Sequence, residues 1–279
     1  MIREAPAKVN LYLKVLGRRP DGWHELDSVM ARLTLVDRIE LDLGAVADSL
    51  TAVTNLPGGL PPDFFGPNNL ALKAVRLFRE WRGWPGPTAI FIEKNIPWGA
   101  GLGGGSSDGA AVLIALNQAA PEPLPAKRIS ELGLALGSDV PFFLATAPLL
   151  RAAGVGERLG PAPTSFAAFR GRKILLVKPS FELATARVFK KLALTNDSAN
   201  NSLGRLLEPV PGWNDLLVPA LSLAPVLTEI TRFLASFQSG TWGLSGSGPT
   251  FWLDRPQPEA VTYLTRLHPD WWVRETSLV

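Results

Sequence analysis

Apolar and polar residues alternate at the start of the chain. Every second side chain from residue 9 to residue 15 is apolar, which predicts a half-buried β-strand whose polar face carries Lys8 and Asn10. The Pro-Asp-Gly sequence at residues 20–22 is typical of a turn. An extended stretch over residues 24–43 follows, so the pattern predicts a hairpin or meander.

A helical repeat and a glycine-rich segment come next. Apolar residues at i, i+4, i+7, i+8 and i+11 predict a helix that is capped by Asn68 and runs to about Trp81. Residues 88–93 predict a strand that leads into a glycine-rich loop at residues 97–108. The following residues, 109–119, are apolar on all sides and predict a buried helix. A further helix over residues 126–136 ends at Gly137.

The second half mixes strands and helices without strict alternation. We expect a turn or hairpin at residues 151–159, strands at 173–178 and 271–275, helices at 185–194, 220–237 and 259–267, a polar loop rich in Asn and Ser after residue 194, and a strand with a second glycine-rich turn at 244–250. This mixture favours an α+β fold over a doubly wound sheet. We place a domain boundary near residue 157, which gives domains 1–157 and 158–279.

The composition is that of a folded protein. Of the 279 residues, 46% are hydrophobic and 19% are charged, which excludes a disordered chain. The net charge of +3 is too small to indicate a polyanion-binding surface by itself. The chain has no cysteine and two histidines. A disulfide scaffold, a thiol nucleophile and a thiolate zinc site are therefore excluded, and a multi-histidine metal centre is not expected.

No targeting or membrane segment is expected. The N-terminus has no apolar run behind a basic start. The longest strongly apolar run, near residues 110–116, falls far short of the roughly 20 residues that span a bilayer. We therefore expect a cytoplasmic protein that does not contact a membrane.

The glycine-rich segment points to phosphate binding. Six glycines lie between Gly99 and Gly109; glycine permits positive φ and close approach of the backbone to a ligand. The helix that follows offers unpaired N–H groups, which suit a phosphate. No Gly-Lys-Ser/Thr sequence is present, so this is not a Walker A loop. Gly99, Gly101 and Gly104 satisfy the pattern G-x-G-x-x-G. A dinucleotide-binding fold also requires an acidic residue at the end of the next strand, and the candidate here, Glu122, lies in a proline-rich loop. The sequence therefore does not favour a dinucleotide-binding fold.

Several segments resemble the GHMP kinase superfamily. The loop PWGAGLGGGSSD at 97–108 is similar to its ATP loop, P-x-x-x-G-L-G-S-S, with three glycines before the serines. The segments APAKVNL at 5–11, GRRPDGWHEL at 17–26 and GSDVPFF at 137–143 are similar to its further motifs, and GVGE at 154–157 and LSGSG at 244–248 also fit. The segments at 5–11 and 17–26 narrow the resemblance to the branch that phosphorylates a cytidine-diphosphate-linked methylerythritol in the non-mevalonate isoprenoid pathway. The resemblance covers residues 5–252.

The resemblance implies a fold, a cofactor and catalytic groups. It implies a two-domain α+β fold with mixed sheets and with helices packed on one face, an N-terminal ATP-binding domain and a C-terminal substrate-side domain. Asp139 would take the proton of the substrate hydroxyl, a task that suits a carboxylate within hydrogen-bond reach. Lys8 would lie beside Asp139 and stabilise negative charge, and Asn10 would contact the same substrate. From the sequence alone, Asp139 could equally be an aspartate of a turn, and Lys8 could be an exposed lysine at the end of a strand.

The resemblance also implies how each ligand is bound. ATP would lie along Pro97, Gly99, Ala100, Gly101, Leu102, Gly103, Gly104, Gly105, Ser106 and Ser107, with Mg²⁺ at its phosphates. Which of the two serines contacts the metal is open, and no acidic ligand is identified. The cytosine would meet His24 at its edge and Trp23 on its face, where the family usually has Tyr, with Thr185 and Phe189 on the other side of the base. Phe189 could equally be a core residue, and the turn at residues 245–248 could be purely structural.

Three other interpretations remain open. The chain could be another small-molecule kinase of the superfamily, acting on homoserine or mevalonate derivatives. It could be an RNA-binding protein without enzymatic activity, because the N-terminal half of these kinases resembles a ribosomal protein domain, or a nucleotide-dependent oxidoreductase. We expect a small-molecule cytidine diphosphate substrate and no nucleic acid. The oligomeric state cannot be predicted from the residues.

Overall fold

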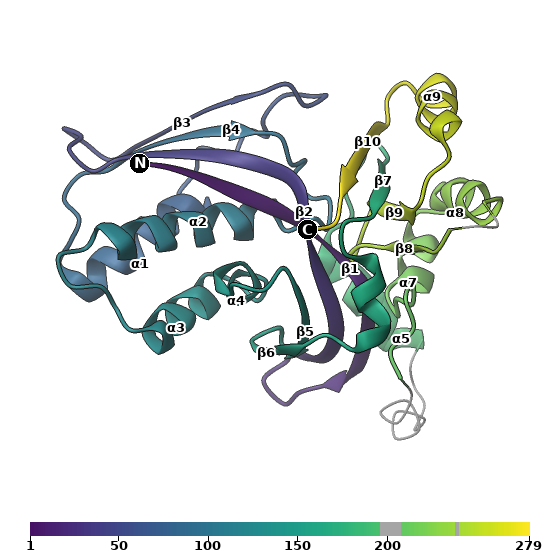
Figure 1. Cartoon of the computed structure of the whole chain (residues 1–279), viewed down its shortest axis with the longest axis horizontal. Coiled ribbons are helices and arrows are strands. Elements are labelled where there is room, and N and C mark those ends of the chain that lie inside the picture. The colour runs from purple at the N-terminus through teal and green to yellow at the C-terminus, as the bar shows by residue number, and fades with distance from the viewer. Residues whose placement is uncertain (196–207, 238–239) are drawn as a thin grey trace. The chain divides into compact units, whose positions relative to one another are not determined.

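The computed structural model describes residues 1–195, 208–237 and 240–279 and divides the chain into two compact units. Unit 1 comprises Met1–Ala7, Leu35–Pro97 and Gly103–Ala147, and unit 2 comprises Lys8–Thr34, Trp98–Leu102 and Pro148–Val279. The long strands β1 (Ile2–Arg18) and β2 (His24–Asp42) contribute residues to both units (Figure 1). The predicted domain boundary at residue 157 divides the chain only once, whereas the units are interleaved along it; that boundary stays a prediction.

Unit 1 packs helices on one face of a mixed sheet, as the resemblance implied (Figure 1). Strand β4 (Ala89–Lys94) pairs in parallel with β3 (Ser49–Thr54) and antiparallel with β2 over Arg38–Asp42. The helices are α1 (Leu70–Arg82), α2 (Gly104–Ala119), α3 (Ala126–Leu136) and α4 (Val140–Leu144). Helix α2 packs on each of the other three. It is buried along most of its length because almost all its side chains are small or apolar.

Unit 2 contains a second, antiparallel sheet. Its strands are ordered β10 (Trp272–Ser277), β7 (Lys173–Lys178), β9 (Phe251–Asp254) and β8 (Trp242–Leu244). The helices in the described part of this unit are α5 (Thr185–Thr195), α7 (Leu217–Leu223), α8 (Leu227–Ala235), α9 (Pro258–Leu267) and the short 3₁₀ helix η1 (Thr164–Phe169). Also in this unit, the start of β2 pairs with β5 (Leu149–Gly154), which forms a hairpin with β6 (Arg158–Pro161).

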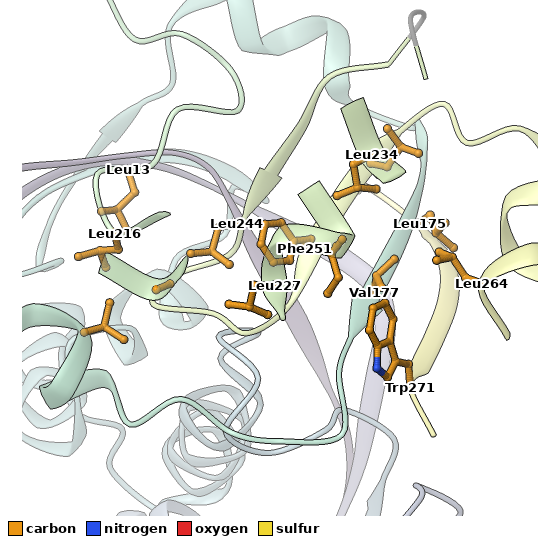
Figure 2. Close-up of a cluster of buried hydrophobic side chains, with 14 of the residues drawn as sticks. Leu13, Leu175, Val177, Leu216, Leu227, Leu234, Leu244, Phe251, Leu264 and Trp271 are labelled. Atoms are coloured by element: carbon orange, nitrogen blue, oxygen red, sulfur yellow. The ribbon is translucent and has the colours of Figure 1, made fainter. Parts of the chain in front are cut away.

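One apolar cluster holds the described part of unit 2 together (Figure 2). Leu175 and Val177 of β7 meet Phe251 of β9 and helix residues such as Leu234 and Leu264. Each buried side chain of this size contributes about 1.5–3 kcal/mol relative to its exposed state. Leu13 and Val15 of β1 belong to the same cluster. The N-terminal strand is therefore part of a core that is otherwise built from the second half of the chain.

Many predicted elements are confirmed. The helix at 126–136, the strand at 173–178 and the turn after β1 are observed, and the N-terminal hairpin is present because β1 pairs with β2. The predicted turn or hairpin near residue 154 is the β5–β6 hairpin. Most of the predicted polar loop after residue 194 lies outside the described residues. None of the helices in the described part of the chain has the length and apolar character needed to cross a membrane.

Other predictions are wrong in detail. The helix cap is Asn69, whose side chain accepts the N–H of Ala71, and not Asn68. The predicted helix at 220–237 is two helices, α7 and α8, because Pro225 interrupts the repeat. Helix α2 begins at Gly104 and includes part of the glycine-rich segment. Strand β3 was not predicted.

The first strand is also more buried than its alternation suggests. The predicted polar face is buried as well: Lys8 is 3% exposed, Asn10 is 5% exposed and Tyr12 is 4% exposed. Alternation of apolar and polar residues normally indicates a sheet with one face exposed to solvent, but here the polar face is buried too. A buried lysine and a buried asparagine need polar partners, and these partners define part of the candidate site.

Candidate active site

The glycine-rich loop changes direction by means of positive φ angles. Gly99, Gly101 and Gly103 have φ values of 59°, 73° and 71°, which cost little for glycine and are strained for other residues. Gly103 is the N-cap of α2 and has no side chain to cap the helix. Ser107 N–H donates to the carbonyl of Gly103. The amides of Gly104 to Ser106 therefore come before the first hydrogen bond of the helix and are available to a ligand.

The start of α2 also carries buried polar atoms. In the described part of the chain, Ser107 Oγ is buried and has no hydrogen-bond partner. A buried hydroxyl without a partner costs roughly 1–3 kcal/mol. Such atoms occur where a ligand completes the hydrogen bonding. Ser107 is therefore the better candidate of the two serines for a contact with phosphate or metal.

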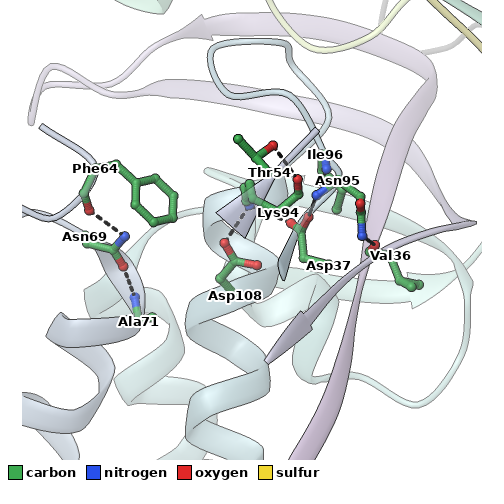
Figure 3. A network of polar contacts seen from close by, with 10 residues as sticks. All are labelled: Val36, Asp37, Thr54, Phe64, Asn69, Ala71, Lys94, Asn95, Ile96 and Asp108. Atoms are coloured by element: carbon green, nitrogen blue, oxygen red, sulfur yellow. Dashed lines mark hydrogen bonds and ion pairs between the residues drawn. The ribbon is translucent and has the colours of Figure 1, made fainter. Parts of the chain in front are cut away.

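A buried ion cluster lies behind this helix start (Figure 3). Lys94 Nζ is 2.5 Å from Asp37 Oδ2 and 2.6 Å from Asp108 Oδ2. Asp37 Oδ1 also accepts the backbone N–H groups of Asn95 and Ile96. Burial raises the pKa of Asp108 to about 7; Lys94 opposes this rise and Asp37 adds to it. Burial alone would lower the pKa of Lys94, but the two carboxylates raise it.

The end of β4, which carries Lys94, leaves no room for a side chain at Gly104. A methyl group on Gly104 would lie 3.1 Å from Lys94 Nζ and 2.9 Å from a methyl group of Ile96. Gly104 therefore has to be a glycine because the end of β4 lies directly behind it. Sequence reasoning did not single out Lys94, but the alternation of buried Ile90, Ile92 and Lys94 along β4 was a usable signal.

Asp139 occupies the N-cap position of α4 and is partly exposed. It follows Gly137, which ends α3. Helix α4 packs on α2, and a methyl group on Gly137 would lie 3.9 Å from Ser106 Oγ. Within unit 1, the turn that carries Asp139 therefore lies beside the first turn of α2, where the phosphate-binding amides were predicted.

In unit 2, Lys8 and Asn10 are joined directly. Lys8 Nζ donates to Asn10 Oδ1 at 2.6 Å, and Asn10 Nδ2 donates to Ser28 Oγ at 2.8 Å. The backbone N–H of Lys8 donates to the carbonyl of Leu102 in the glycine-rich loop at 2.9 Å. The prediction had Asn10 contacting substrate; the structure shows that its amide already binds Lys8 and Ser28.

The second glycine-rich turn lies against both Lys8 and the first loop. Ser245 Oγ donates to the carbonyl of Gly101 at 2.8 Å and accepts the N–H of Asn10 at 3.3 Å. A methyl group on Gly101 would overlap the carbonyl oxygen of Ser245, and one on Gly246 would lie 3.5 Å from Lys8 Nζ. Asn214 holds the turn from the other side by donating to the carbonyls of Leu244 and Gly246.

The residues predicted to hold the base lie in unit 2 as well. The rings of His24 and Phe189 are 4.6 Å apart and tilted by 32°. Thr185 Oγ1 is 2.8 Å from Ser247 Oγ, which links α5 to the second glycine-rich turn. Burial lowers the pKa of His24, and the positive charge of the nearby Arg18 lowers it further. The imidazole is therefore neutral at neutral pH. Trp23 is 58% exposed and presents its ring to solvent.

The described residues contain no cluster of three or more His, Asp or Glu side chains that could hold a metal ion. Within unit 1, the structure brings together the amides of α2, Ser106 and the turn of Asp139. Within unit 2, it brings together Lys8, Asn10, Gly101 and the second glycine-rich turn, and it pairs His24 with Phe189. Each predicted role in binding or catalysis stays a prediction.

Comparisons with known proteins found a matching family model, similar sequences and similar folds. Residues 69–146 match the model of the GHMP kinases N terminal domain. The chain is 40% identical over 254 residues to a 4-diphosphocytidyl-2-C-methyl-D-erythritol kinase of Geobacter sulfurreducens, which covers 88% of this chain and 87% of that protein. A crystal structure of 4-(cytidine 5'-diphospho)-2C-methyl-D-erythritol kinase matches with a TM-score of 0.74 and 34% identity, and 99% of each chain is covered. The mevalonate kinase of Methanococcus jannaschii has the same fold, with a TM-score of 0.62 at 16% identity and coverage of 100% of this chain and 98% of that one.

Proposed function

Because this chain belongs to the 4-diphosphocytidyl-2-C-methyl-D-erythritol kinases, a family of GHMP kinases, we propose that it transfers the terminal phosphoryl group of ATP to a hydroxyl group of that cytidine diphosphate. This reaction is a step of the non-mevalonate isoprenoid pathway, and we expect it to take place in the cytoplasm. The observation that carries the proposal is the helix start at Gly104, with its uncommitted amides, beside the turn of Asp139.

The backbone amides of Gly104 to Ser106 bind the phosphates of ATP, within the predicted stretch from Gly103 to Ser107, because they come before the first hydrogen bond of the helix. Glycines with positive φ precede the helix and let the backbone approach the ligand closely, and the helix dipole adds a partial positive charge. The rest of the loop, from Pro97 to Leu102, lies along the bound ATP and shapes its binding site. Phosphoryl transfer needs mainly positioning and neutralisation of charge, and a rigid array of amides supplies both.

Mg²⁺ fits the residues at this helix start. Ser107 Oγ is buried and unpartnered among the described residues, and a hydroxyl is the kind of oxygen ligand that Mg²⁺ accepts together with phosphate oxygens and water. Asp108 Oδ1 is likewise buried and unpartnered there. Ser107 is therefore the residue that would hold the metal. When bound, Mg²⁺ would neutralise charge on the phosphate oxygens.

Asp139 accepts the proton of the attacking hydroxyl, and Lys8 stabilises the negative charge that develops on the oxygens. His24 recognises the edge of the cytosine. Its neutral imidazole accepts a hydrogen bond from the exocyclic amino group, a donor that uracil lacks. Trp23 and Phe189 offer flat faces for stacking, which needs no hydroxyl at position 23. Thr185, at the start of α5, contacts the substrate beside the second glycine-rich turn.

A phosphorylation assay tests this proposal. ATP with Mg²⁺ and 4-diphosphocytidyl-2-C-methyl-D-erythritol should give a phosphorylated product, whereas mevalonate and homoserine should give none above background. Turnover of mevalonate or homoserine without turnover of the cytidine substrate would replace this function by that of another kinase of the same superfamily.

A further inference from the structure

A hydrogen-bond chain of fixed direction runs through the buried part of unit 2. It begins at the backbone carbonyl of Tyr12, passes through Ser28 and Asn10, and ends at Lys8. Ser28, Asn10 and Lys8 are each no more than 5% exposed. In such surroundings an amide turned the wrong way loses two hydrogen bonds with no water to replace them.

The direction of the chain follows from the number of protons. A carbonyl oxygen can only accept, so the single hydroxyl proton of Ser28 goes to the carbonyl of Tyr12 at 2.6 Å. Ser28 Oγ can then only accept from Asn10. The NH₂ group of Asn10 must therefore face Ser28, and its oxygen must face the ammonium of Lys8, which can only donate.

The backbone of Asn10 is fixed independently of this chain. Its N–H donates to Ser245 Oγ at 3.3 Å, and its carbonyl accepts the indole N–H of Trp252 at 3.0 Å. The backbone N–H of Lys8 is bound to Leu102. With the main chain held, the orientation of the Asn10 amide decides whether Asn10 presents an acceptor or a donor to Lys8 Nζ.

We propose that Ser28 is a positioning residue of this kinase, which orients the Asn10 amide and thereby holds the Lys8 ammonium in place for phosphoryl transfer. The inference rests on the proposed function. Ser28 touches neither substrate nor ATP in this scheme. Its contribution is to keep an oxygen, rather than an NH₂ group, against Lys8.

The first test compares Ser28→Ala with Ser28→Thr. Loss of the hydroxyl removes one of the two groups that direct the Asn10 amide and leaves its buried NH₂ group without the Ser28 acceptor, so the amide is held less firmly against Lys8. We expect kcat to fall about ten- to a hundredfold, the scale of a misplaced catalytic group. KM for ATP and for the cytidine substrate should stay within about twofold, because no binding contact is lost. Ser28→Thr keeps the hydroxyl and should restore kcat. Ser180→Ala removes an exposed hydroxyl that binds Asp270 and is the matched control with unchanged kcat.

A second test separates positioning from a general loss of structure. In the Asn10→Asp background the side chain presents two equivalent oxygens, so there is no orientation for Ser28 to select. Adding Ser28→Ala should then lower kcat by less than about threefold, although the single variants are each impaired. An equal fold loss in both backgrounds, or an unchanged kcat for Ser28→Ala in the wild-type background, overturns the proposal.

A readout without substrate keeps the inference distinct from the proposed function. The Cε–Hε NMR signal of Lys8, assigned by its loss in Lys8→Met, should shift in Ser28→Ala and return to its wild-type position in Ser28→Thr. If the wild-type protein does not phosphorylate the cytidine substrate, the proposed function fails and this signal still reports on the hydrogen-bond chain. An unmoved Lys8 signal in Ser28→Ala overturns the chain itself.

Discussion

Among the residues that the structure describes, a buried lysine lies close to a glycine position in each unit, and the two lysines have different partners. In unit 1, Lys94 touches the Gly104 position and binds two carboxylates. In unit 2, Lys8 lies near the Gly246 position and donates to the neutral amide of Asn10. The two carboxylates offset the charge of the Lys94 ammonium, whereas a neutral amide does not change the charge of the ammonium it accepts from. We therefore expect a structural role for Lys94, while the proposed function gives Lys8 a role in phosphoryl transfer.

The largest expected effect comes from Asp139 of unit 1, which, like Lys8, is proposed to act directly in phosphoryl transfer. Asp139→Asn should fold normally and lose turnover by about 10²–10⁴-fold, the usual contribution of a general base. Steady-state kinetics, with circular dichroism as the control for folding, measure this. Wild-type kinetics in this variant would remove Asp139 from the reaction.

The matched pair Lys94→Met and Lys8→Met tests the comparison directly. Lys94→Met leaves two carboxylates buried without their ammonium, so the free energy of unfolding should fall by about 3–5 kcal/mol. Lys8→Met should lose turnover, and its free energy of unfolding should fall less than that of Lys94→Met, because the hydrogen bond from Lys8 to Asn10 goes to a neutral amide and not to a buried carboxylate. Urea denaturation and kinetics on both proteins supply the two numbers. A stable but inactive Lys94→Met protein would reverse the assignment.

A smaller effect concerns the base. If His24 accepts the amino group of cytosine, a uridine analogue should lose about ten- to a hundredfold in kcat/KM, which corresponds to roughly 1–3 kcal/mol for an unpaired group. His24→Ala should reduce this discrimination. Equal rates for both nucleotides in the wild-type protein would show that His24 does not recognise the base.

The smallest effect is a pH dependence. Because burial lowers the pKa of His24 from 6.5, the imidazole stays neutral at neutral pH and takes up a proton only on acidification below 6.5. Its neutral form is the acceptor, so KM for the cytidine substrate should be constant near pH 7 and rise at lower pH. The rise should be absent in His24→Gln. A rise that begins above pH 6.5 would contradict the lowered pKa.

How far the sequence leads depends on whether the controlling interaction is local. The turn at 20–22, the helix stop at Gly137 and the positive φ angles of the glycine-rich loop follow from neighbouring residues, and these were predicted. The break between α7 and α8 was also signalled locally, by Pro225, but the apolar repeat on either side hid it.

Interactions between distant residues could not be predicted. Asp37 and Asp108 meet at Lys94 only because β4 pairs with β2 and α2 packs in the same unit. Ser28 contacts Asn10 because β1 and β2 pair, and the residues next to Ser28 in the sequence give no sign of this contact. The burial of Lys8 was missed for the same reason, because the residues that cover the second face of β1 lie far away in the sequence.

The interleaving of the two units has a consequence for dissecting this protein into fragments. A polypeptide that starts at residue 158 would lack Leu13 and Val15, and their places among Leu175, Phe251 and Leu227 would be empty. It would also lack the carbonyl of Leu13, to which the amide of Asp215 donates. Separately expressed halves cut at this point should therefore be insoluble or molten, and regain order only when mixed.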